Sequence, residues 1–71
     1  MPITNTERAL AAAQAAQTYV QVKGLEQEPM DDILTDLLTD LFHLMEQEGI
    51  CHTDITRRAQ AHYNAEIRGE G

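Results

Sequence analysis

Hydrophobic positions recur along this chain with the period of an α-helix, and they fall into three segments. The spacing predicts helices at about residues 5–22, 29–48 and 54–68. Thr4 with Glu7 three residues later is a capping-box pattern, and Gly24 and Gly49 suit the left-handed position that follows a helix. No segment shows the strict polar–apolar alternation of a half-buried strand. We therefore predict a single all-α, three-helix domain over residues 1–71.

The middle segment has the strongest amphipathic pattern. Pro29 suits its first position, and two aspartates follow where the helix dipole favours negative charge. On a helical wheel, its large apolar residues fill an arc of about 180°, and these are Met30, Ile33, Leu34, Leu37, Leu38, Leu41, Phe42, Leu44 and Met45. A helix with one neighbour needs a narrower arc. We therefore expect two helices of the chain, or one helix and a symmetry mate, to cover this long central helix.

The two flanking segments have weaker apolar faces. Six alanines between Ala9 and Ala16 give the first segment high helix propensity but little area to bury. We therefore expect it to be peripheral, with most of its packing supplied by its tail, residues 19–25. The third helix is predicted to start with Thr53 or Asp54 as its N-cap. Its short connection to the central helix predicts a C-terminal αα-hairpin.

The width of the central apolar arc also predicts self-association. Aromatic side chains are frequent anchors of protein interfaces, and the arc and the third helix each supply one. We expect an interface, in a homodimer or another small oligomer, made of Leu37, Leu41, Phe42, Leu44 and Tyr63.

Charge is unevenly distributed along the chain. Twelve acidic and five basic residues give a formal charge of −7, and residues 24–56 hold nine of the acids and no lysine or arginine. This balance argues against direct binding to nucleic acid, which requires clustered basic residues. Successive aspartates at i, i+4 spacing share one helix face and repel each other slightly. That face is either a solvated surface that gives solubility or a docking surface for a basic partner protein, with candidate contacts Asp32, Asp36, Asp40, His43 and Glu46.

Few residues offer chemistry. Asp36, Asp40 and His43 lie on one helix face, but metal sites in helical bundles collect ligands from several helices and face the interior. Cys51 and His52 are adjacent, without the C-x-x-C spacing of a zinc site or the glycine-rich elbow of a nucleophile. We expect Cys51 to be a partly buried small apolar residue at the turn. We predict no metal site, no catalytic residues and no enzymatic activity.

Other binding motifs and targeting signals are also missing from the sequence. It has no glycine-rich phosphate loop and no dinucleotide motif, so we expect no cofactor. Arg57 and Arg58 are expected to pair with acids of the second helix or of a partner subunit. No secretory signal is seen, and no apolar run approaches the roughly 18 residues of a membrane span. We therefore expect a cytoplasmic protein without membrane contact.

The C-terminal half carries a pattern that resembles a short module in small proteins of bacterial plasmids and phages. The residues that carry it are Asp36–His43, Gly49, Arg57–Ala59, His62, Tyr63 and Glu66. The resemblance implies a mobile-element origin, not a reaction. Small acidic helical proteins from such sources often resemble inhibitors of host defence, including anti-CRISPR proteins and DNA mimics. We therefore expect a non-enzymatic interaction protein that presents its acidic face to a basic host surface. The alternative is a small structural or regulatory homo-oligomer whose charge serves only solubility.

Overall fold

The helix pattern of the sequence is reproduced in a computed structural model, which describes residues 3–70. The chain forms α1 (Asn5–Lys23), α2 (Met30–Gln47) and α3 (His52–Glu70), and the described residues contain no strand. The predicted all-α, three-helix fold is thus confirmed. The predicted bounds are off by one residue at both ends of α2 and at the end of α1, and by two residues at both ends of α3.

Local hydrogen bonds explain most of these ends. The Thr4 hydroxyl accepts from the Glu7 backbone N–H, and the Glu7 carboxylate accepts from the Thr4 backbone N–H, which is the predicted capping box. Gly24 and Gly49 have φ angles of +70° and +72°, as predicted for residues that follow a helix. Pro29 lies one residue outside α2, as its N-cap, and not at the first helical position.

The predicted start of α3 is wrong. The helix begins at His52, and the Ile55 N–H donates to the Cys51 carbonyl, so its first turn includes the positions proposed for the N-cap. Asp54 does not cap the helix, because its carboxylate accepts from the Arg57 guanidinium at 3.0 Å. Arg57 therefore pairs with an acid of its own helix, whereas the sequence predicts a pair with α2 or with a partner subunit.

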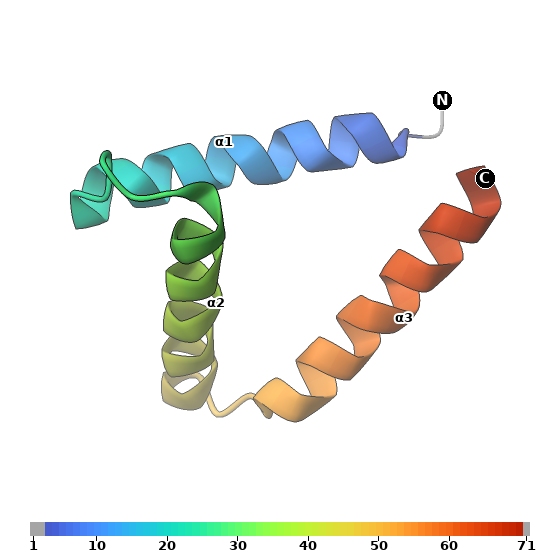
Figure 1. The fold of residues 1–71 in the computed structure, drawn as a ribbon. Coiled ribbons are helices and arrows are strands. Elements are labelled where there is room, and N and C mark those ends of the chain that lie inside the picture. The colour runs from blue at the N-terminus through green and yellow to red at the C-terminus, as the bar shows by residue number, and fades with distance from the viewer. Residues whose placement is uncertain (1–2, 71) are drawn as a thin grey trace.

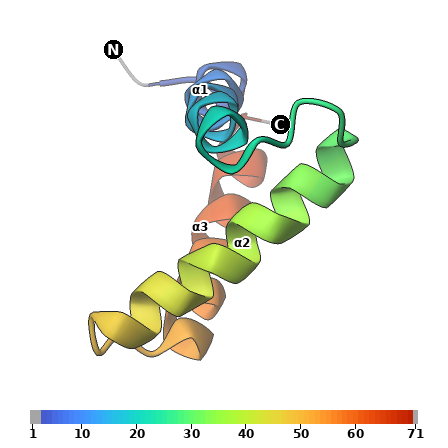
Figure 2. The same ribbon diagram turned by 90° about the vertical axis from the view of Figure 1, so that its left-hand side faces the viewer.

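The three helices form an open triangle (Figure 1). A short loop leads from the C-terminal end of α1 into α2, which runs away from α1. Helix α3 then runs back, so that its C-terminal end lies near the N-terminal half of α1. Viewed along α1, α2 crosses below that helix and extends away from it (Figure 2). Each helix contacts both others. The α2–α3 connection is short, as the predicted hairpin requires, but the two helices diverge from it.

The core is very small. Among the described residues only Ala16, Val20 and Ile33 are buried, two from α1 and one from α2. The expectation that α1 is peripheral is therefore wrong. Its tail does pack as predicted, with Tyr19 and Leu25 half-buried beside Val20, but Ala16 contributes as well. Because alanine faces bury little area, these contacts leave much of the α2 apolar arc uncovered.

Candidate functional site

Four polar residues of α2 form an exposed surface, which we call the acidic face: Asp32, Asp36, His43 and Glu46. They share one side of the helix by their spacing. Within residues 3–70 the three carboxylates make no ion pair. Each can therefore approach a cation from outside the chain without breaking a contact within it.

Asp40 was predicted to belong to this surface, but it serves the fold. Its carboxylate accepts a hydrogen bond from the Tyr19 hydroxyl and a second one, at 2.9 Å, from the Lys23 ammonium group. The hydrogen bond from Tyr19, followed by that from Lys23, lowers the pKa of Asp40. Asp40 thus joins α2 to α1 and is half-buried.

The same contacts shift the two partners on α1. Partial desolvation and then the hydrogen bond to Asp40 raise the pKa of Tyr19. The hydrogen bond to Asp40 and its negative charge raise the pKa of Lys23, whose Nζ also lies 5.7 Å from the centre of the Tyr19 ring. Charge counting over residues 24–56 overlooks this pair because Lys23 stands one residue before that window.

The residues predicted for self-association fall into two groups. Leu41, Leu44 and Tyr63 are exposed, as an interface residue of a free subunit should be. Leu37 and Phe42 are half-buried. The Phe42 ring stacks on His52 with ring centroids 4.6 Å apart, so it supports the turn between α2 and α3.

Sequence reasoning missed three further exposed residues of α2. Met30, Leu34 and Leu38 are 58%, 49% and 48% exposed. They were placed in the apolar arc, but the sequence did not show which part of that arc the other helices leave open. With two of the predicted residues they make up the apolar stripe, defined here as Met30, Leu34, Leu38, Leu41 and Leu44.

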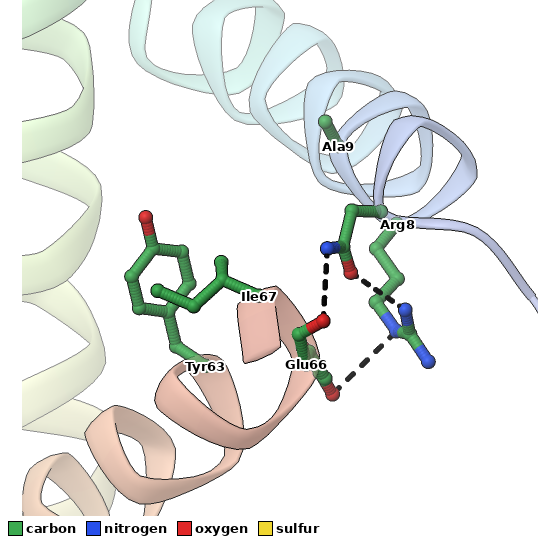
Figure 3. Close-up of a pocket in the computed structure, with 6 residues that line it drawn as sticks. Arg8, Ala9, Tyr63, Glu66 and Ile67 are labelled. Atoms are coloured by element: carbon green, nitrogen blue, oxygen red, sulfur yellow. Dashed lines mark hydrogen bonds and ion pairs between the residues drawn. The ribbon is translucent and has the colours of Figure 1, made fainter. Parts of the chain in front are cut away.

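A polar contact closes the triangle between α1 and α3 (Figure 3). The Asn5 amide donates to the Glu66 carbonyl at 3.2 Å, and the Arg8 guanidinium lies 3.5 Å from the Glu66 carboxylate. Beside this contact is an open pocket of about 390 Å³, into which Tyr63 and Ile67 also point. Asn5, Arg8 and Glu66 are already engaged with one another, so the pocket offers few free polar groups to orient a small molecule.

The reactive groups considered from the sequence are Cys51 and the possible metal ligands of α2. Cys51 is exposed at the turn, so the expectation of partial burial is wrong. No group of three or more His, Cys, Asp or Glu residues among residues 3–70 is placed to hold a metal ion. None of the described helices is both long and apolar enough to cross a membrane. The exposed surfaces of α2 are thus the main candidates for a function.

Comparison of the chain with protein-family models, with curated proteins and with solved structures gives no match. The acidic face and the apolar stripe of α2 are therefore the features from which a function is inferred.

Proposed function

We propose that this protein is a small non-enzymatic binding protein of a phage or plasmid. In this proposal the acidic face of α2 docks on a basic surface of a host protein that handles nucleic acid or defends the cell, and so inhibits it in the manner of an anti-CRISPR protein. The observation that carries the proposal is that Asp32, Asp36 and Glu46 stand exposed on a regular helix without an ion pair in the described chain.

The spacing of the carboxylates supports a competitive mode of inhibition. Asp32 and Asp36 are four residues apart, which places them about 6 Å apart along the helix axis. A rigid row of negative charges of this kind resembles a nucleic-acid backbone and can occupy a groove built for phosphates. Since the helix fixes the backbone that carries these carboxylates before binding, docking has only their side chains to order.

The test is affinity capture from the host cell with a doubly substituted variant, Asp32→Lys with Asp36→Lys. Asp40 is left unchanged, because substituting it would break the contact with Lys23 and Tyr19 and disturb the fold. The matched control is Glu26→Lys with Glu28→Lys, which makes the same change of net charge in the exposed loop before α2. We expect the first variant to lose the captured partner and the control to retain it.

Salt provides the second arm of this test. A partner held by charge should elute as the ionic strength rises, whereas one held by apolar contacts should remain bound. If both variants lose the partner equally, net charge alone governs capture and the acidic face is not the binding surface. Unchanged capture by the Asp32 and Asp36 variant contradicts the proposal directly.

The second candidate function is a small structural or regulatory homo-oligomer, in which the charge serves only solubility. The observation that favours it is different: the apolar stripe on α2 is exposed in the single chain. Since this stripe and the acidic face occupy opposite sides of α2, the two candidates can be tested separately.

A further inference from the structure

The chain exposes more surface than a compact protein of its mass. A globular monomer of 8.0 kDa exposes about 4,450 Å², whereas this chain exposes 5819 Å². Its radius of gyration is 13.8 Å, against about 11 Å for a compact domain of 71 residues. The excess area is about 1,400 Å². A standard protein interface buries about 800 Å² of each partner, so the open triangle has enough uncovered surface for one.

Much of the uncovered apolar surface lies on α2. The residues of the apolar stripe are each between 38% and 58% exposed. With the half-buried Leu37, four of them also form a heptad series, because positions 30, 34, 37, 41 and 44 are separated by steps of four, three, four and three. This spacing keeps one seam of side chains directed at a neighbouring helix that runs alongside. No helix of the described chain runs alongside α2 in this way, because α1 crosses it and α3 diverges from it (Figures 1 and 2).

The surface next to the stripe is suited to a closely packed helix. A groove of about 230 Å³ separates α1 from the start of α2, and Ala9, Ala12, Ala13 and Ala16 line it opposite Met30 and Leu34. Small side chains let another helix approach closely, and the groove can receive an apolar side chain from it. The apolar surface thus continues from α2 onto the alanine face of α1.

Charge around the stripe favours a second copy of this chain over a basic partner. The acidic face lies on the opposite side of α2, so two stripes can meet without bringing those carboxylates together. Of the two aspartates nearest the stripe, Asp40 is paired with Lys23, and Asp31 lies at the start of the helix. The stripe itself contains no charged side chain to recognise a basic partner, but its leucines are complementary to a copy of themselves, as a two-fold symmetric interface requires.

We propose that a second copy of this chain covers the apolar stripe and the adjoining alanine groove, giving a homodimer packed mainly through α2. Leu34, Leu38 and Leu41 form the centre of the interface. This inference deepens the second candidate function, and it stands whether or not the acidic face binds a host protein.

Sedimentation equilibrium of the full chain tests the proposal, over about a hundredfold range of concentration so that association is resolved. The expected mass at the upper end is twice 8.0 kDa. Thermal unfolding followed by circular dichroism should show a midpoint that rises with concentration, because association stabilises only the folded chain. A wild-type chain that remains at 8.0 kDa throughout and melts at one temperature overturns the proposal.

Charge substitutions then locate the interface. Leu34→Glu and Leu38→Glu each place a carboxylate in the stripe, at positions about half exposed in the single chain. Each change occurs twice in a dimer and, through lost apolar burial together with the cost of desolvating a carboxylate, removes roughly tenfold or more in affinity each time, so the dissociation constant should rise by at least about 100-fold. Val22→Glu is the matched control, since Val22 is 79% exposed on α1 and outside the stripe.

A dimer that persists in both leucine variants, or one that Val22→Glu disrupts equally, overturns the assignment of the interface. If a glutamate variant fails to fold, Leu34→Ala replaces it, with an expected weakening of about tenfold. A monomeric result leaves the acidic-face proposal intact, because that proposal is tested by different variants and by capture, not by mass.

Discussion

Two neighbouring residues of α2 should respond very differently to the same substitution. Ile33 is 6% exposed and belongs to the small core, whereas Leu34 is 49% exposed on the apolar stripe. Ile33→Ala and Leu34→Ala remove similar amounts of hydrocarbon from consecutive positions of one helix. Because alanine favours the helix at both sites, differences in stability report the tertiary environment and not helix propensity.

The expected magnitudes follow from burial. Truncating a buried isoleucine to alanine costs about 2–5 kcal/mol, because transfer free energy is lost and a cavity remains. Leu34 is half exposed and leaves no enclosed cavity, so its truncation should cost about 1 kcal/mol in the monomer. The free energy of unfolding of a 71-residue domain is about 4–11 kcal/mol. Ile33→Ala should therefore remove a large share of it, and Leu34→Ala a small one.

Thermal unfolding by circular dichroism in dilute solution measures the difference. One kcal/mol corresponds to about 4–8 °C in a domain of this size, so Ile33→Ala should lower Tm by at least about 8 °C, and Leu34→Ala by about 4–8 °C and always by less than Ile33→Ala. At higher concentration the loss at Leu34 should grow, because the proposed dimer buries this side chain. Equal losses at both positions in dilute solution would refute the assignment of Ile33 to the core.

Four further outcomes follow from individual residues. The pKa of Asp40 lies below its ordinary value of 3.8 in the folded chain, so the stability that Asp40 contributes is complete above pH 3.8 and is lost as the pH falls through the lowered pKa. In an acid titration, the free energy of unfolding of Asp40→Asn should therefore decline less steeply than that of the wild type. The pKa of Lys23 lies above its ordinary 10.5, so its contribution is present below that pH and is lost as the pH rises further, and alkaline titration of Lys23→Met should lack this loss. Gly24→Ala should destabilise the fold by about 1 kcal/mol because residue 24 has a positive φ, whereas Gly69→Ala, in open space within α3, should stabilise it by up to about 1 kcal/mol. Changes of opposite sign in the free energy of unfolding, measured by chemical denaturation, would confirm that backbone conformation is the cause. Thr4→Ala removes the hydroxyl of the capping box and should cost about 1 kcal/mol, measured in the same way, while an unchanged midpoint would show that the cap is not formed in solution.

Local interactions explain why the helices themselves were predictable. The end of a helix is determined by groups within three or four residues, such as the reciprocal hydrogen bonds of Thr4 and Glu7 or the positive φ of Gly24. Where the local signal was ambiguous the prediction was wrong. Asp54 can cap a helix or pair with Arg57, and only the structure shows which of the two it does.

The arrangement of the helices could not be predicted, because it depends on contacts between distant residues. Tyr19 meets Asp40 across 21 positions, and Asn5 meets Glu66 across 61. An alanine face accepts a neighbouring helix at several angles with little difference in buried area, so the sequence of α1 does not specify how α2 crosses it. For the same reason the pattern could identify the wide apolar arc but not which of its residues remain exposed.

The opposite placement of the acidic face and the apolar stripe on α2 has a consequence for valency. A dimer joined through its stripes would carry two acidic faces that point in opposite directions. A single flat surface could not engage both, so one dimer would bridge two partner molecules or two sites on an extended assembly. If both sites belong to one extended assembly, binding of the first acidic face would hold the second face at a high effective concentration near its site, and this would strengthen binding without any additional contact. Dissociation of the dimer would then weaken the proposed inhibition, even though each acidic face remained intact.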